Sequence, residues 1–401
     1  MSMNDGAFKG VKVLDLGQIY NGPYCGLMLG LLGADVIKVE PTGGERLRFR
    51  SQDDVETHEF LMLNSNKRSM IVDLKLAQGR DLFLALVDEV DVVIENFAPN
   101  TMERLGLDPQ DLLRRNERLI YASGKGYGST GPYAAMAAMD ITVQAMSGVV
   151  ASTGFADGPP VKAGPAFVDF MGGIHLFGGI ASALYQRERT GKGQLVEVSM
   201  HDTVYPTLAS SLGAIFNDPG ARIPERTGNR HSGLAVAPYN IYRANDGWLA
   251  IISVSERHFE AIMRVIGRED LIADQRFSDR FARVRNMDAL DAAIEAWSTG
   301  LERWAAAELL SAAGVPCAPV LTVHEVSEDR HLVERGMVQY VPHPNGGTVP
   351  VPASAIRMSD SPVGGLRAAP ALGRDTDDVL FELLGLDDAE RATLRASGAI
   401  K

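Results

Sequence analysis

Apolar, β-branched runs alternate with stretches of helical spacing through the first half of the chain. Residues 11–16 (VKVLDL) and 34–39 (ADVIKV) have the character of strands, and apolar residues recur at helical spacing over 22–32 between them. The same pattern predicts strands at 69–74, 92–94, 119–122 and 194–199 and a helix at 79–90. Strands that alternate with helices in this way predict an α/β fold with a parallel sheet covered by helices.

The pattern changes after residue 216. Residues 217–233 are rich in Pro, Gly and polar side chains and are typical of a linker. Residues 234–314 indicate a smaller α+β domain, and from residue 315 the chain is Pro-rich and irregular. The elements predicted in this half are a strand at 248–253 and helices at 258–266, within 280–313 and at 376–384.

The chain is acidic, with 51 Asp and Glu against 39 Lys and Arg among 401 residues and a net charge of −12. This charge argues against nonspecific attraction to nucleic acid or to an anionic lipid surface. A polyanionic ligand would therefore need a local group of cations.

Three features predict a cytoplasmic protein. Residues 1–10 are polar and lack a basic stretch followed by an apolar one, so we expect no secretory signal. Cys25 and Cys317 lie far apart without CxxC spacing, which fits a reducing compartment and argues against a cysteine-based zinc site. The longest apolar run, 170–185, is shorter than the roughly 20 residues that span a bilayer, so we expect a core helix and no membrane anchor.

One carboxylate stands at the head of that apolar run. In GPAFVDFMGGIHLFGGIASALY, residues 164–185, Asp169 precedes a glycine-rich helix. Asp is a preferred helix N-cap, so a structural role and a catalytic role are both open. The two roles are compatible, because the helix dipole would keep the carboxylate ionised and the glycines would let a ligand approach the backbone. An ionised, accessible Asp is what covalent acyl catalysis requires.

Other motifs are less informative. GYGSTG, residues 126–131, matches GxGxxG after a predicted strand, but Pro132 follows where a dinucleotide site needs the start of a helix. The chain contains no GxSxG, HExxH or GxxxxGK[ST] sequence. The histidines are scattered singly, and we expect His175 to be a satisfied core residue.

The combination of several segments resembles the class III CoA-transferases, the family of the formyl-CoA, carnitine and benzylsuccinate CoA-transferases and of α-methylacyl-CoA racemase. The resemblance runs from near Gly10 to the last residues. The segments that carry it are GVKVLDLG, LGADVIKVE, NSNKRSMIVDLK, VIENFAPNTMERLGL, GYGSTGPY, TGFADGPPVKAGPAFVDFMGGIHLFGGIASALYQRERTGKGQLVEVSMHD, GNRH, APYNIYRANDGW, GVPCAPV and LGRDTDDVL.

This resemblance implies a fold and an assembly. It implies a Rossmann-like large domain built from residues 1–216 and from part of 315–401, which also contains a returning linker. The smaller domain, 234–314, is then inserted after the linker 217–233. It further implies an interlocked homodimer, with each active site between the large domain of one chain and the small domain of the other.

The resemblance also implies a role for Asp169, which stands at the nucleophile's position in the transferases. Asp169 would attack an acyl-CoA to give a mixed anhydride, and the released CoA thiolate would then form an aspartyl-CoA thioester. A small carboxylic acid would accept CoA by the reverse steps, with no prosthetic group. Backbone N–H groups near Gly172 and Gly173 are candidates to stabilise the oxyanions.

The family's CoA contacts are carried over by matching segments. Lys67 and Arg104 are the cations expected to bind the phosphates of CoA. For Arg68 two roles are open, contact with CoA or a structural salt bridge. Contact at Tyr20 and Asn21 is expected without a defined chemistry. The residues expected in the CoA site are Tyr20, Asn21, Asn64, Ser65, Asn66, Lys67, Asn96, Phe97, Ala98, Arg104, Met139 and Asp140.

The family supports a second reaction, racemisation of 2-methylacyl-CoA by a His and an Asp. Met139 stands at the racemase histidine position, followed by Asp140, and a thioether cannot exchange protons. Glu256 matches a racemase glutamate, although a solvated charge at a helix start explains it as well. The sequence therefore favours the transferase. A CoA-binding protein without chemistry is the third alternative, and the presence of Asp169 argues against it.

One segment departs from the formyl-CoA transferases. They carry a run of consecutive glycines after the linker's GN, whereas this chain has only Gly233 beyond Gly228. This difference argues against strict formyl-CoA:oxalate activity. We expect residues 229–239, with Arg230 and His231, to form part of the acyl pocket instead.

Overall fold

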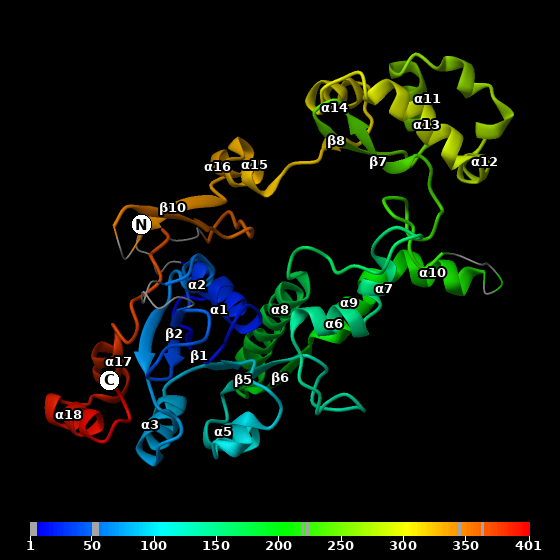
Figure 1. Ribbon diagram of the computed structural model, residues 1–401. Coiled ribbons are helices and arrows are strands. Elements are labelled where there is room, and N and C mark those ends of the chain that lie inside the picture. Colours follow the sequence, from blue (N-terminus) through cyan, green and yellow to red (C-terminus); the bar gives the residue numbers. More distant parts are fainter. Residues whose placement is uncertain (1–5, 50–55, 219, 221–223, 344–345, 362–364) are drawn as a thin grey trace. The chain divides into compact units, whose positions relative to one another are not determined.

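The computed structural model describes residues 6–49, 56–218, 220, 224–343, 346–361 and 365–401. Residues 1–5 of the N-terminal segment and residues 219 and 221–223 of the expected linker lie outside the described residues. The chain divides into two compact units. The first comprises Met1–Val143, Pro165–Val204 and Arg330–Lys401, and the second comprises Gln144–Gly164 and Tyr205–Asp329 (Figure 1).

A six-stranded parallel sheet forms the centre of the first unit, in the order β3-β2-β1-β4-β5-β6. This sheet confirms the predicted α/β class. Chain order reverses between β1 and β4, so the loops that follow these two strands run to opposite sides and leave a crevice. The strands are β1 Lys12–Asp15, β2 Asp35–Glu40, β3 Arg68–Ile71, β4 Val92–Glu95, β5 Ile120–Lys125 and β6 Gln194–Ser199.

Successive residues of a strand point to opposite faces of the sheet, so strands that are apolar throughout present two apolar faces. Helices cover both of these faces. Val13 and Val92 pack with α1 (Asn21–Leu31) and α8 (Phe167–Thr190), whereas Leu14 packs on the opposite face. The strands therefore read as continuous apolar runs, as expected for a sheet buried on both faces. Four helices contribute residues to the hydrophobic core on that opposite face: α3 Ala77–Asp88, α4 Thr101–Arg104, α5 Pro109–Arg115 and α17 Thr376–Leu384. Figure 1 labels α3, α5 and α17.

Helix α8 is the predicted apolar helix. By length and composition alone it could cross a membrane, a test that a core helix also passes. Here it packs against α1, β5 and β6, with Leu176 and Ile180 fully buried. Gly173 allows α1 to approach closely, because a Cβ there would lie 2.7 Å from the Asn21 carbonyl oxygen.

The C-terminal segment completes the first unit along the edge strand β3. The Ser69 N–H donates to Asp375 Oδ2 at 2.8 Å, and the Asp73 N–H donates to the Ala399 carbonyl at 2.9 Å. The edge of the sheet is thereby covered. This part of the unit contains α16 Arg330–Glu334, the hairpin β10 Val338–Pro342 and β11 Thr348–Pro352, which packs on α2 His58–Asn64, and α18 Asp388–Ala396.

The second unit has its own core around an antiparallel sheet in the order β7-β8-β9. The helical stretch predicted over 280–313 is three helices, α12, α13 and α14. Residues 144–164 and 205–216, predicted in the large domain, and residues 315–329, predicted in the returning segment, also group with this unit. The predicted domain limits stay a prediction. Its main elements are β7 Tyr239–Ala244, β8 Gly247–Ile252, β9 Cys317–Pro319, α11 Glu256–Val265, α12 Arg280–Arg285, α13 Met287–Ser298 and α14 Arg303–Ala312; shorter ones are α7 Val149–Ser152, α10 Ala209–Asn217 and α15 Val323–Ser327.

Buried ion pairs tie the β1 and β2 ends of the sheet to its surroundings. The Lys67 ammonium lies 2.7 Å from Asp15 Oδ2, and Arg48 lies 2.6 Å from Glu40 Oε2, with all four side chains fully buried. Burial lowers the pKa of Lys67 to about 8, although the charge of Asp15 opposes this shift. Loss of one partner would leave a buried charge uncompensated, so these pairs fix where the two strands end.

Candidate functional site

A cavity of about 850 Å³ lies at the carboxyl ends of the strands, where β1 and β4 diverge. Its size is in the usual range for a small-molecule or cofactor site. The residues that follow β1, β4 and β5 form much of its wall, because parallel strands deliver their carboxyl ends to one edge of the sheet. The cavity lies entirely within the first unit, and its wall includes Gln18, Asn96, Lys125 and Asp169.

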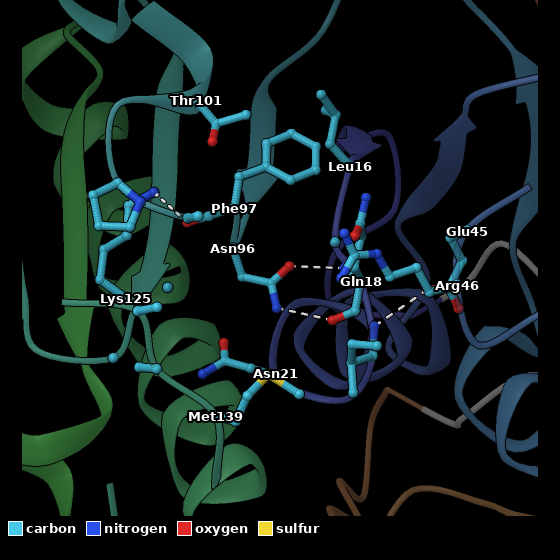
Figure 2. Close-up of a pocket in the computed structure, with 18 of the residues that line it drawn as sticks. Leu16, Gln18, Asn21, Glu45, Arg46, Asn96, Phe97, Thr101, Lys125 and Met139 are labelled. Atoms are coloured by element: carbon cyan, nitrogen blue, oxygen red, sulfur yellow. Dashed lines mark hydrogen bonds between the residues drawn. The ribbon is translucent and has the colours of Figure 1, made fainter. Parts of the chain in front are cut away.

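The loops after β1 and β4 are braced across the crevice. The Gln18 N–H donates to Asn96 Oδ1 at 2.7 Å, and Asn96 Nδ2 donates to the Gln18 carbonyl at 2.9 Å (Figure 2). Lys125 Nζ, at the end of β5, donates to the Phe97 carbonyl at 3.0 Å and pairs with Glu95. Ile19 has a φ of 64°, an unfavourable value for a β-branched residue. The loops are therefore joined across the crevice by hydrogen bonds, next to one residue in a strained backbone conformation.

Asp169 borders this cavity from the first turn of α8, with 9% of its surface exposed. The helix begins at Phe167, so Asp169 is its third residue. Asp140 Oδ2 accepts hydrogen bonds from the N–H groups of Val168, at 2.9 Å, and Asp169, at 3.3 Å. Asp140 (start of helix α6, Asp140–Met146), and not Asp169, therefore takes the capping role that the sequence had left open.

The charge state of Asp169 also differs from the expectation that the helix dipole keeps it ionised. Burial, and then the nearby negative charge of Asp140, raise the pKa of Asp169 to about 7. Both causes disfavour the carboxylate form. Asp169 therefore changes its charge near neutral pH, in a position that opens on a cavity.

The glycines of α8 do not provide the expected backbone donors. Gly172 and Gly173 are the sixth and seventh residues of the helix, so their N–H groups donate to carbonyls of the preceding turn. The unpaired N–H groups of a helix belong to its first turn, where Asp140 accepts two of them here. The oxyanion role predicted for Gly172 and Gly173 has no geometric basis, and a donor must come from elsewhere.

The structure separates the expected CoA contacts into two groups. Residues Asn21, Asn96, Phe97, Ala98 and Met139 line the cavity together with Asp169. Residues Asn64, Ser65, Asn66 and Lys67 are buried beneath α1 and do not line it.

Lys67 shows why that second group turns inward. Its ammonium donates to Asp15 Oδ2, the Pro23 carbonyl and Asn64 Oδ1 at 2.7–2.9 Å, so its three protons are used inside the fold. We therefore assign Lys67 to the support of the cavity and not to phosphate binding.

The remaining expected contacts lie at the margin. Tyr20 stacks on Phe170, with ring centroids 5.8 Å apart. Arg104 is exposed at the end of α4 and donates to Thr101 Oγ1, and Thr101 itself lines the cavity. Asp140 lies behind Asp169 as its helix cap.

The sequence analysis missed three cations of the cavity wall. Arg46 and Lys75 are exposed, and Lys125 is partly buried. Lys125 is paired with Glu95, and the acids Glu40, Glu45 and Asp73 also line the cavity, so Arg46 and Lys75 are the two exposed cations that a polyanionic ligand could meet there. Lys75 and Lys125 follow predicted strands, so strand order could have placed them at the same edge.

Several other candidates have structural partners. Arg68 pairs with Asp35 at 2.8 Å and Glu382 at 2.6 Å, which fits the salt-bridge alternative. His175 is exposed, so its predicted place in the core is wrong, although its Nδ1 is paired with the Met171 carbonyl at 2.8 Å. Its burial fails because it lies on the side of α8 that faces away from the sheet.

In the second unit, the segment expected to form an acyl pocket is tied to α13. Arg230 pairs with Asp288 and Asp291, both at 2.7 Å. His231 Nδ1 accepts from the Gly233 N–H at 3.1 Å. Glu256 begins α11 and pairs with Arg283, which lowers the pKa of Glu256. Among the described residues, no group of three or more His, Cys, Asp or Glu is arranged to hold a metal ion.

Comparison with known proteins gives a consistent family. The family described as CoA-transferase family III matches residues 8–376. The formyl-CoA:oxalate CoA-transferase of Streptomyces coelicolor is 36% identical over 413 residues, covering 98% of this chain and 99% of that protein. The acetyl-CoA:oxalate CoA-transferase of Acetobacter aceti is 38% identical over 367 residues, covering 88% and 90%.

A solved structure agrees with this assignment. A CAIB/BAIF family protein from Brucella suis superposes with a TM-score of 0.81 at 35% identity, covering 94% of this chain and 99% of that one. The fold, the sequence identity and the coverage of the match thus indicate the same family. The chain belongs to CoA-transferase family III and is a CoA-transferase.

Proposed function

We propose that this enzyme moves CoA from an acyl-CoA to a small carboxylic acid through covalent intermediates on Asp169. The observation that carries the proposal is the position of Asp169: a buried carboxylate in the first turn of α8, with a pKa near 7, that opens on a large cavity at the crevice of the sheet. Groups with a pKa raised by burial beside a cavity are typical of catalytic sites.

The reaction balances without an added reactant. The Asp169 carboxylate attacks the thioester carbon, the C–S bond breaks, and the products are a mixed anhydride and CoA thiolate. The thiolate then attacks Cγ of Asp169, the bond from Cγ to the bridging oxygen breaks, and the first acid leaves as a carboxylate. The aspartyl-CoA thioester passes CoA to an acceptor carboxylate by the same steps in reverse.

Burial of Asp169 suits this chemistry in two ways. A desolvated carboxylate is held in a less favourable charged state, so attack on a thioester relieves part of that cost. The same burial limits access of water to the anhydride, which hydrolysis would otherwise destroy. At neutral pH a substantial fraction of Asp169 is still ionised, because its pKa is about 7.

Charge in the cavity wall supports binding of the CoA end. Arg46 and Lys75 line the cavity, and Arg104 is bonded to Thr101 of its wall, so we propose these three cations as the phosphate contacts. The relatives named above act on oxalate, and we propose a small carboxylate of this kind as the acceptor.

The first prediction concerns Asp169 directly. Wild-type protein given formyl-, acetyl- or succinyl-CoA with oxalate or another small carboxylic acid should form the new acyl-CoA, detected by mass spectrometry. Asp169→Asn keeps the size of the side chain but removes the nucleophile, so exchange should fall at least about 10⁴-fold while CoA binding persists in calorimetry.

The racemase alternative makes a different prediction for enzyme given 2-methylacyl-CoA in heavy water. Met139 occupies the position of the racemase histidine, lines the cavity and has no transferable proton. Deuterium uptake at C2 of 2-methylacyl-CoA in heavy water, without formation of a new acyl-CoA from any pairing, would contradict the transferase.

The second prediction concerns pH. Asp169 acts as the carboxylate, so kcat/KM for the acyl-CoA should rise about tenfold per pH unit below pH ~7 and level off above it. Asp140→Asn removes the charge that helps to raise the pKa of Asp169 and keeps an acceptor oxygen for the two N–H groups. The pKa of Asp169 should fall, and the rise in kcat/KM should move to lower pH. Identical profiles for the variant and the wild type would contradict this electrostatic coupling.

The third prediction concerns assembly. We propose an interlocked homodimer, which follows from the family resemblance, and a cytoplasmic location, which follows from the polar N-terminal sequence and the two distant cysteines. Helix α10 supports an interface, because none of its residues is buried and Ile215 and Phe216 are 58% and 70% exposed. Light scattering should give twice the chain mass of 43.2 kDa, and Phe216→Glu should lower the midpoint of thermal unfolding, because interlocked chains separate only when they unfold. A wild-type monomer that transfers CoA would contradict the proposal.

A further inference from the structure

Asn21, the first residue of α1, carries a buried amide with no hydrogen-bond partner. It is 2% exposed, and neither Oδ1 nor Nδ2 has a partner in the described structure. Its neighbour across the crevice, Asn96, uses both of its amide atoms on Gln18 (Figure 2). Buried polar groups are nearly always paired, so an unpaired amide in the wall of a cavity indicates a ligand.

Two glycines leave the space that this amide occupies. A Cβ on Gly172 of α8 would lie 2.2 Å from Asn21 Nδ2, and a Cβ on Gly124 of β5 would lie 2.5 Å from Oδ1. Neither glycine has the positive φ that would require glycine for its backbone conformation. Their common feature is the space they leave, which the Asn21 amide fills. The amide is therefore positioned by two elements besides its own.

The amide also lies beside the reacting carboxylate. Gly172 follows Asp169 by three residues on α8, and Cβ positions three apart on a helix are about 5–6 Å from each other. Nδ2 lies 2.2 Å from the Cβ position of Gly172, so it is within about 8 Å of the Asp169 Cβ. Asn21 and Asp169 also line the same cavity.

We infer that Asn21 Nδ2 donates a hydrogen bond to the oxyanions that form at Asp169 during CoA transfer. This inference rests on the proposed function. When CoA thiolate bonds to Cγ of Asp169, an electron pair moves onto the carbonyl oxygen, and Asn21 stabilises that charge. The pair returns as the bond from Cγ to the bridging oxygen breaks, and the carboxylate leaves. Asn21 thus fills the role that the N–H groups of Gly172 and Gly173 cannot fill.

The test uses Asn21→Ala in the full-length protein, with the donor and acceptor pair that the wild type exchanges. Loss of one oxyanion donor should lower kcat by about 10²–10³-fold, with KM for the acyl-CoA little changed. The midpoint of thermal unfolding should stay the same or rise, because the side chain removed has no partner to lose. Asn96→Ala is the matched comparison for stability, since it breaks two hydrogen bonds and should lower the midpoint.

A second variant keeps the inference falsifiable if Asn21→Ala alters the fold. In the wild type, Gly172→Ala should displace the Asn21 amide and lower kcat; in the Asn21→Ala background it should cost little more. Fully additive effects on kcat would overturn the inference, as would wild-type kcat in a folded Asn21→Ala variant. If the wild type itself exchanges no acyl-CoA, the proposed function fails together with this inference; if it exchanges and Asn21→Ala does too, only the role of Asn21 fails.

Discussion

The reversal of strand order between β1 and β4 is the constraint on which the site depends. Two loops that leave adjacent strands in opposite directions cannot hydrogen-bond along their length, so a crevice opens between them. The exchange of two hydrogen bonds between Asn96 and Gln18 fixes its width, and the buried Lys67–Asp15 pair fixes the end of β1. Asp169 lines the cavity at this edge, so its position relative to the other cavity residues depends on these contacts.

Desolvation is the second determinant of the chemistry. Burial in the first turn of α8, next to Asp140, makes the charged form of Asp169 less favourable than in water. In the proposed mechanism the same environment would raise the reactivity of the carboxylate and protect the anhydride. Because Gly172 and Gly124 have no side chains, the Asn21 amide packs closely against them and supplies a polar group in the wall of the cavity.

Pattern alone predicted the parallel sheet, because strands buried on both faces have a strong apolar signal. The segment around Asp169 and the stretch Asn96, Phe97 and Ala98 could also be placed from the sequence. The inward turn of Lys67 could not, since it depends on acceptors contributed by Asp15 and Pro23, far away in the chain. The capping of α8 by Asp140 and the orphaned amide of Asn21 are likewise long-range contacts that no local pattern encodes.

The most direct measurement follows oxygen from the acceptor into Asp169. The enzyme turns over an unlabelled acyl-CoA with an acceptor acid whose carboxylate carries ¹⁸O, and the peptide spanning residues 163–187 is then weighed by mass spectrometry. The acceptor carboxylate attacks Cγ of Asp169, expels CoA thiolate and supplies the bridging oxygen of the new anhydride. The thiolate then attacks the acceptor's acyl carbon, and the bond from that carbon to the bridging oxygen breaks, so this oxygen stays on Asp169. The account therefore predicts a gain of about 2 Da per labelled oxygen, located at Asp169. Product formation with an unlabelled Asp169 would contradict it.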